Sequence, residues 1–232
     1  MCLPPTVTKL AIFHEMQLSS QDQTWFNTLK TYRMIAVIRT HSMGLGLAMA
    51  KAIAQGGGRL IEITWNSDRP ADLIETLRAE LPHCIIGCGT LLTQTDIQTA
   101  IAAGAQFGFM PHVDGALIRY ACDRGLPMHP GALTPTEIMT AWNAGANGVK
   151  IFPVSTLGGS QYIRSLQGPL SQIPLIPTGG VTLHNARDFI EAGAIAVGLA
   201  GDLFPRDAII HQDWPQISQR TRTLLHSLNE AH

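Results

Sequence analysis

The chain has 232 residues, of which 45% are hydrophobic and 14% are charged, so it can build a sizeable core and is not expected to be disordered. Its formal net charge of -1, without a basic cluster, argues against a nucleic-acid-binding or anionic-membrane surface. No apolar run approaches the ~18 residues needed to span a bilayer, and the N-terminus lacks the pattern of a signal peptide. We therefore expect a soluble, cytoplasmic protein with no nucleic-acid or membrane partner.

Residue spacings typical of metal sites are absent from the sequence. The four cysteines (Cys2, Cys84, Cys88 and Cys122) include no CxxC pair, and the nine histidines include no HxH or HExxH spacing. We expect no metal site for this reason. Cys84 and Cys88 flank an apolar run and are expected to be small core side chains. Cysteines without such pairing fit a reducing compartment.

In chain order, residues 1–18 have no clear partner and are expected to be an N-terminal extension, while residues 19–232 form one domain. The segment Ser20–Tyr32 predicts a helix before the first strand, which could cover the base of a barrel. Short apolar runs then alternate with helical stretches, up to a last outer helix from Trp214 to about Leu228. This alternation indicates βαβ units and a parallel sheet. The expected strands are Met34–Thr40, Arg59–Thr64, Cys84–Gly89, Gln106–Met110, Pro127–His129, Gly148–Phe152, Pro174–Pro177 and Ala194–Gly198.

A glycine recurs where helices are expected to end. Gly56, Gly104, Gly145 and Gly193 are spaced 41 to 48 residues apart, about two βα units each. Glycine at the position after a helix explains this recurrence. Eight βα units at this length favour a single-domain (β/α)8 TIM barrel with an extra N-terminal helix, and an open doubly wound sheet is the alternative. No GxGxxG follows the first strand, which disfavours a dinucleotide-binding version.

Lys150 occupies an unusual place for a lysine. The other three lysines lie in polar stretches of the N-terminal quarter, whereas Lys150 lies in the short apolar run Asn147–Pro153. An ammonium buried in a strand loses hydration, which favours the neutral amine that attacks carbonyl groups. Lys150 is therefore either a Schiff-base nucleophile or a strand-end lysine that reaches water or pairs with a carboxylate.

Alternation along two strands assigns their inward and outward positions. Glu62 and Lys150 both point into the interior, where two opposite charges are plausible only if they approach each other or serve a ligand. Glu62 is then a salt-bridge partner of Lys150 or a general acid/base beside a Schiff base. The inward positions are Leu60, Glu62, Thr64, Lys150 and Phe152, and the outward positions are Ile61, Ile63, Val149 and Ile151.

Two glycine pairs follow the sixth and seventh expected strands. Thr178-Gly179-Gly180 comes after a strand and precedes the expected helix Thr182–Glu191. Consecutive glycines at such a place present backbone N–H groups to a phosphate or carboxylate, or simply form a tight turn. Gly158-Gly159 carries the same ambiguity.

Several segments between Met34 and Phe204 resemble, in order, the class I 2-keto-3-deoxy-6-phosphogluconate (KDPG)/4-hydroxy-2-oxoglutarate (KHG) aldolase family. The match favours the Schiff-base interpretation of Lys150. It implies a (β/α)8 barrel, usually a homotrimer, that needs no metal or other cofactor and acts on a small keto acid. The segments are Ile61-Glu62-Ile63-Thr64, Gly87-Cys88-Gly89-Thr90, Pro130-Gly131 with Thr134-Pro135-Thr136-Glu137, Lys150-Ile151-Phe152-Pro153 and Pro177-Thr178-Gly179-Gly180.

The resemblance also implies roles for individual residues. Lys150 would form an imine with the pyruvate carbonyl, and Glu62 would move protons through water between the enamine carbon and the C4 hydroxyl. Thr90 would hold the pyruvate carboxylate. The remaining substrate contacts would come from Phe152 at the imine, from Pro111, and from Thr178, Gly179 and Gly180 at the far end; His112, after Pro111, either contacts the substrate or only caps its loop.

Two departures from the family pattern concern the ends of the substrate. Asn66 stands where many members have an arginine that grips the carboxylate, and Arg39 could supply that charge instead. Some members that act on the galactonate-derived substrate resemble this combination. After the last strand, Gly198-Leu199-Ala200-Gly201-Asp202 replaces a common phosphate-binding turn with a hydroxyl. Asp202 would weaken phosphate binding if its carboxylate faces the ligand.

The expected activity is cleavage of KDPG to pyruvate and glyceraldehyde 3-phosphate, or its reverse. The alternatives within the family are KHG cleavage to pyruvate and glyoxylate, and cleavage of 2-keto-3-deoxy-6-phosphogalactonate. Oxaloacetate decarboxylation through the same imine would be a side activity. A different class of function is an isomerase or a non-catalytic sugar-phosphate-binding barrel in which the lysine is structural.

Overall fold

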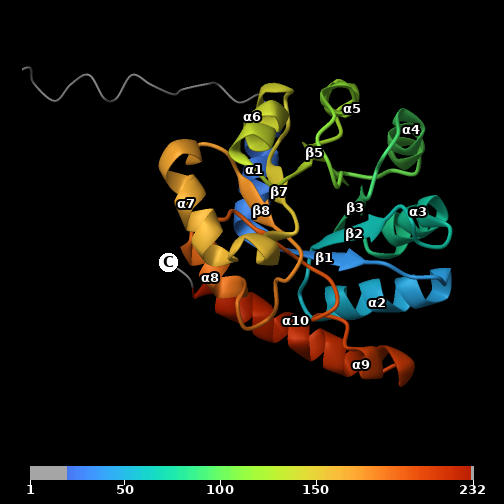
Figure 1. Cartoon of the computed structure of the whole chain (residues 1–232). Helices are drawn as coiled ribbons and strands as arrows, with labels where there is room; N and C mark the ends of the chain where they lie inside the picture. The colour runs from blue at the N-terminus through green and yellow to red at the C-terminus, as the bar shows by residue number, and fades with distance from the viewer. Residues whose placement is uncertain (1–19, 231–232) are drawn as a thin grey trace, which may run out of the picture.

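The structure is a computed structural model that describes residues 20–230, and the expected extension over residues 1–18 lies outside this range. Strands and helices alternate along the chain, and the helices lie mostly outside the strands (Figure 1). The strands are β1 (Met34–Ile38), β2 (Leu60–Thr64), β3 (Ile85–Gly89), β4 (Gly108–Phe109), β5 (Met128–His129), β6 (Gly131–Ala132), β7 (Val149–Ile151), β8 (Leu175–Pro177) and β9 (Val197–Leu199).

The helices follow the strands in the order that βαβ units require. Among the described helices, none is long and apolar enough to cross a membrane. They are α1 (Ser20–Tyr32), α2 (Met43–Gln55), α3 (Pro70–Glu80), α4 (Gln94–Ala102), α5 (Gly115–Cys122), α6 (Pro135–Asn143), the 3₁₀-helix η1 (Val154–Leu157), α7 (Ser160–Leu170), α8 (Ala186–Glu191), α9 (Arg206–Ile210) and α10 (Trp214–Asn229).

The described strands pair in parallel, in the orders β5-β4-β3-β2-β1-β9 and β6-β7-β8. Seven of the eight expected strands contain an observed one, and the eighth, Ala194–Gly198, overlaps β9, which ends one residue later. The α/β class with parallel strands is therefore confirmed. The short strand β6 was not expected, and Pro130 separates it from β5. Proline has no N–H to donate, which interrupts the ladder. Its carbonyl still accepts a hydrogen bond from Lys150 N at 2.9 Å, so the chain on either side of Pro130 links the two sheets.

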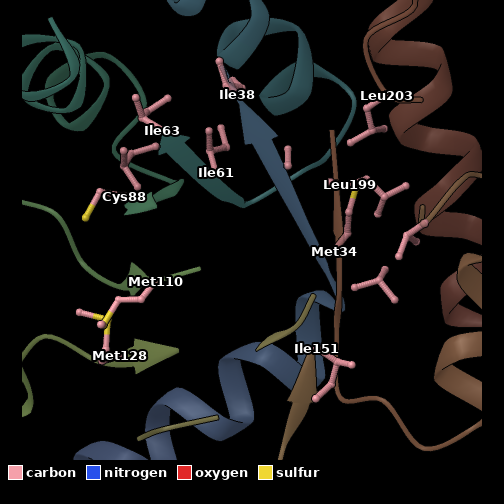
Figure 2. Close-up of a cluster of buried hydrophobic side chains, with 14 of the residues drawn as sticks. Met34, Ile38, Ile61, Ile63, Cys88, Met110, Met128, Ile151, Leu199 and Leu203 are labelled. Atoms are coloured by element: carbon pink, nitrogen blue, oxygen red, sulfur yellow. The ribbon is translucent and has the colours of Figure 1, made fainter. Parts of the chain in front are cut away.

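The predicted strand faces are confirmed by two separate clusters of buried side chains. Ile61, Ile63 and Ile151 belong to a large cluster between the strands and the outer helices (Figure 2). Leu60 belongs instead to a smaller inner cluster on the other face of the strands, which also contains Trp25 of α1. Burial on both faces explains why these strands are nearly continuous apolar runs.

The recurring glycines do end helices, with one correction. Gly104, Gly145 and Gly193 have φ of 84°, 97° and 102°, a backbone conformation that favours glycine. After α2, however, Gly57 rather than Gly56 has the positive φ, at 95°. Gly56 is required for a different reason, because a Cβ there would lie 2.5 Å from Thr221 Cβ of α10. It allows α10 to pack closely on α2.

The helix expected over Thr182–Glu191 is shorter than predicted, because α8 begins only at Ala186. The residues before it form a turn held by side chains. The Asn185 side-chain oxygen accepts a hydrogen bond from Thr182 N at 2.7 Å, and Asp202 Oδ2 accepts one from Leu183 N at 2.7 Å. These N–H groups are therefore bonded without a helical turn.

Candidate active site

The carboxyl ends of the strands carry the polar residues singled out from the sequence. Glu62 of β2 pairs in register with Val37 of β1 and Gly87 of β3. Lys150 of β7 pairs with Gly131 of β6 and Ile176 of β8. In parallel α/β proteins, ligands bind where the strands end and the following loops begin, so this end of the molecule is the candidate site.

Glu62 is buried, and its surroundings perturb its acidity. Only 2% of the residue is exposed. Burial raises the pKa of the carboxyl above its ordinary value, while the positive charges of Lys150 and Arg39 partly oppose this increase. The carboxylate lies directly over Gly89 of β3, since a Cβ at that glycine would be 1.7 Å from Glu62 Oε1. Gly89 is therefore needed for this position of the carboxylate.

Lys150 lies in an aromatic environment rather than in a salt bridge. The residue is 7% exposed. Its Nζ is 4.7 Å from the centroid of the Phe152 ring and 5.7 Å from that of Phe109, within reach of cation–π contact. Among the ion pairs of the described residues, none joins Lys150 to Glu62 within 4.0 Å. The direct salt bridge considered from the sequence is thus not formed.

A cavity of about 450 Å³ adjoins this pair on the side of Phe152. Neither Lys150 nor Glu62 lines it, so it lies beside the charged pair and does not enclose it. Pro111 can approach β6 only because a glycine stands opposite: a Cβ at Gly131 would be 2.6 Å from the Pro111 carbonyl carbon. The lining includes Pro111, His112, Gly131, Leu133, Glu137 and Phe152.

Thr90 immediately follows β3 with a strained backbone. Its φ is 61°, a conformation that β-branched residues rarely adopt. Such strain costs on the order of 1–3 kcal/mol and persists only where the surroundings impose it, often at functional sites. The next residue is anchored, since Leu91 N donates to Phe109 O at 3.2 Å. Thr90 is therefore held just after the carboxyl end of β3, which is the strand adjacent to β2 with Glu62.

The turn after β8 lies against the Phe152 ring. Gly179 and Gly180 have φ of 82° and 90°. A Cβ at Gly179 would be 3.0 Å from the Phe152 ring, so the glycine permits close contact. Thr178 bridges to Gly198 of β9, and its carbonyl accepts a hydrogen bond from Val154 N at 3.0 Å. Phe152 therefore joins the turn to the lysine.

The remaining candidates lie at the rim. Arg39 is exposed, yet it is near enough to Glu62 to lower the pKa of that carboxyl. Asn66 is exposed, as is His112, which lines the cavity. Within residues 20–230, no group of three or more His, Cys, Asp or Glu side chains is arranged to hold a metal ion.

Comparison with known proteins identifies the family. The model of the KDPG and KHG aldolase family matches residues 26–220. This chain belongs to that family. The aldolase is 32% identical over 209 residues to the 2-dehydro-3-deoxy-phosphogluconate aldolase of Haemophilus influenzae, covering 90% of this chain and 98% of that protein. Membership makes it an aldehyde-lyase and confirms the resemblance found in the sequence motifs.

Two solved structures resemble the aldolase in fold. One, described as native KDPGal, is 32% identical with a TM-score of 0.78 and covers 85% of this chain and 95% of that chain. The other is the KDPG aldolase of Legionella pneumophila with pyruvate captured as a covalent carbinolamine, at 26% identity and a TM-score of 0.79, covering 86% of this chain and 97% of that chain.

Some residues of the aldolase site were not identified from the sequence. Phe109 contacts Lys150, and its ring stacks on that of His129, with the two centroids 4.6 Å apart. His129 in turn accepts a hydrogen bond from Trp25 of α1 at 2.7 Å. Alternation in the fourth strand would have placed Phe109 inward. The contact between Trp25 and His129 spans 104 residues of sequence, and no local pattern indicates it.

Proposed function

We propose that this aldolase cleaves KDPG to pyruvate and glyceraldehyde 3-phosphate, or forms it in reverse, through an imine on Lys150. The observation that carries the proposal is the pairing of a buried amine with a buried carboxylate that it does not neutralise by direct contact. A structural lysine would gain most from a closed salt bridge. The separation of Lys150 from Glu62 instead leaves both groups available to a ligand.

The arrangement supports a mechanism in ordered steps. The neutral Lys150 amine adds to the C2 carbonyl, and loss of water from the carbinolamine gives a protonated imine, which is an electron sink. Glu62 then takes the C4 hydroxyl proton through a water, and the C3–C4 bond breaks. The aldehyde departs, and an enamine remains on Lys150. Glu62 returns the proton to C3, and hydrolysis releases pyruvate. A raised pKa suits a carboxyl that must both accept and donate a proton near neutral pH.

The substrate is proposed to lie between two groups of residues. Arg39 and Thr90 would hold the pyruvate carboxylate, while the flat faces of Pro111 and Phe152 would pack against the imine. Thr178, Gly179 and Gly180 would line the far end, where backbone N–H groups of a glycine turn suit a phosphate. No metal or other cofactor takes part in these steps.

We propose that the strands carrying the site close into a (β/α)8 barrel. Its support is the bridge between Thr178 and Gly198, which joins β8 to β9, together with the continuity of β5 and β6 through Pro130. Helix α1 would cover the end of the barrel where the strands begin, because its Trp25 and Leu29 belong to the inner cluster. A homotrimer in the cytoplasm is the arrangement that the family resemblance implies.

Borohydride reduction in the presence of pyruvate tests the reaction. We expect one reduced pyruvate adduct, located by mass spectrometry on the peptide that contains Lys150. The Lys150→Met variant should form none, and Lys51→Met, at an exposed ion pair with Glu80, should behave as the unaltered protein. An unmodified Lys150 peptide would refute the Schiff-base mechanism. If the same protein also cleaved none of the keto acids, a non-catalytic sugar-phosphate-binding barrel would be favoured.

Two related substrates remain as alternatives. The presence of both Arg39 and Asn66 in the sequence and the structural likeness to native KDPGal favour 2-keto-3-deoxy-6-phosphogalactonate as the second candidate. KHG is the third and differs in having no phosphate. Values of kcat/KM for the three compounds rank them. If the phosphorylated compounds are preferred over KHG by less than about tenfold, about 1.4 kcal/mol, KHG would be favoured as the substrate.

A further inference from the structure

Asp202 lies beside the turn proposed to receive the substrate phosphate. It follows β9, and β9 meets β8 at the bridge between Thr178 and Gly198. In (β/α)8 enzymes, a phosphate is often bound by the loops after the last two strands. A free carboxylate at this place would repel a phosphate dianion. The charge of Asp202 therefore bears directly on the class of substrate.

The carboxylate of Asp202 is bonded on both oxygens. Oδ2 accepts a hydrogen bond from Leu183 N at 2.7 Å, in the turn that precedes α8. Oδ1 forms an ion pair with Arg220 Nη2 at 3.1 Å, from helix α10. The negative charge is thus compensated by a neighbouring cation, and one lone-pair direction on each oxygen is occupied by protein.

Arg220 is bound to Asp202 by more than the ion pair. Its Nε and Nη2 also donate to the backbone carbonyl of Asp202, at 2.9 Å and 2.6 Å. A planar guanidinium that makes several bonds to one residue fixes the orientation of that residue. Three elements meet here: the turn after β8, the loop after β9 and the last helix.

The same turn is fixed from its other side. The Asn185 side chain donates to Gly180 O at 3.0 Å and accepts from Thr182 N. Gly180 itself has little freedom, because a Cβ there would lie 2.4 Å from Ser155 Cβ of η1. The backbone from Gly179 to Leu183 is therefore held by contacts with η1, Asn185 and Asp202.

We propose that Asp202 and Arg220 form a charge-neutral clasp that holds the turn after β8 and makes this end of the site compatible with a phosphorylated substrate. The pair acts through the turn and through its charge balance, so both are positioning and specificity residues that take no part in bond making. This inference rests on the proposed aldolase reaction. It predicts that the phosphorylated 2-keto-3-deoxy sugar acids are the substrates despite the acidic residue.

Replacing Arg220 with an uncharged side chain tests the charge balance. In Arg220→Met, the uncompensated Asp202 should raise KM for KDPG by at least about fivefold with kcat nearly unchanged, while KM for unphosphorylated 2-keto-3-deoxygluconate changes less than about twofold. About 1 M salt should remove much of the difference, since it screens partly exposed charges. The double variant Asp202→Asn/Arg220→Met has no charge to repel phosphate, so its KM for KDPG should return close to that of the unaltered protein.

The matched control is Arg187→Met, which removes an exposed arginine from its ion pair with Glu191 in α8, and it should alter neither KM. If Arg220→Met impairs both substrates equally and the double variant does not recover, the pair is only structural and the proposal is wrong. Asp202→Asn alone keeps an acceptor for Leu183 N and should bind KDPG at least as well as the unaltered protein. Weaker binding of KDPG by that variant would also overturn the clasp.

These outcomes differ from a failure of the proposed function. Absence of a pyruvate adduct on Lys150 and of any cleavage in the unaltered protein would refute the aldolase reaction itself. Normal cleavage without the selective response to Arg220→Met would leave the reaction standing and refute the clasp.

Discussion

At the scale of single residues, Glu62 is subject to two opposing electrostatic effects. Burial favours the neutral carboxyl, and the nearby charges of Lys150 and Arg39 favour the anion, with burial the larger effect. The neutral form is therefore more favoured than it is for an exposed carboxyl. Both states are needed by a group that removes and returns a proton in one catalytic cycle.

The position of that carboxylate depends on Gly89. We expect Gly89→Ala to displace Glu62, because the new Cβ would meet Oε1 at 1.7 Å. Cleavage of KDPG should fall by at least about 10²-fold, the usual contribution of a positioned acid/base group, while the pyruvate adduct on Lys150 still forms. Steady-state rates and borohydride trapping measure the two effects separately.

Gly168→Ala is the matched control for this substitution, since nothing lies within 4 Å of a Cβ at that position in α7. Its rate should equal that of the unaltered protein. A Gly89→Ala variant that retains cleavage within about threefold would show that the working position of the Glu62 carboxylate does not depend on Gly89.

At the scale of elements, helix α1 is tied to the site through a buried histidine. Trp25 Nε1 donates to His129 Nε2, and His129 Nδ1 lies 3.0 Å from the carbonyl oxygen of Gly108. Nδ1 must therefore carry the proton, and the ring is neutral. His129 stacks on Phe109, which contacts Lys150. Because the ring is neutral, His129 adds no positive charge next to the Phe109 ring that Lys150 contacts.

The pH dependence of stability tests this arrangement. Burial lowers the pKa of His129 to about 4, whereas the ordinary value is 6.5. As the pH falls, His129 is therefore protonated in the unfolded chain before it is protonated in the folded protein. The contribution of the neutral, buried His129 to the free energy of unfolding is intact above pH 6.5 and is lost between pH 6.5 and 4. The loss should approach about 3 kcal/mol, at 1.4 kcal/mol per pKa unit. Urea unfolding across this range should show a slope that His129→Leu removes.

The variant also leaves the Trp25 N–H without its acceptor, so it should be less stable at every pH by about 1–3 kcal/mol. The comparison therefore concerns slopes and not absolute values. His83→Leu, at an exposed position, should keep the slope of the unaltered protein. An unchanged slope in His129→Leu would mean that this histidine does not titrate as the burial requires.

The elements also show what the sequence could predict. Strands buried on both faces are apolar runs, and alternation within them correctly placed Leu60 and Ile61 on opposite faces. The break at Pro130 and the late start of α8 were missed, because a missing N–H and the side chains of Asn185 and Asp202 decide them.

The site was predictable to the extent that it follows this alternation. Glu62 and Lys150 were directed to one interior by parity alone, and both are buried. The pairs Trp25–His129 and Asp202–Arg220 join residues 104 and 18 positions apart. Such contacts arise only when the elements pack, and therefore no local spacing indicates them.

At the scale of the whole molecule, Gly198 lies where the last strand meets both the first strand and the turn after β8. Strand β9 pairs with β1 through Ile35 and Gly198, and Gly198 also forms the bridge to Thr178 after β8. A Cβ at Gly198 would lie 2.5 Å from Thr178 Oγ1. Closure of the proposed barrel thus depends on the absence of a side chain at this glycine.

Gly198→Ala should separate β8 from β9 and open the ring of strands. We expect a loss of stability of about 1–3 kcal/mol, the usual cost of overpacking a well-packed contact, and faster hydrogen exchange of Ile195 N, which donates to Leu175 O of β8. Gly201→Ala is the control, because nothing lies within 4 Å of a Cβ there. If both variants unfold and exchange alike, the strands do not close at Gly198, and the doubly wound alternative regains support. If only Gly198→Ala loosens β8 and β9, the contact between them holds the two sheets together as one barrel.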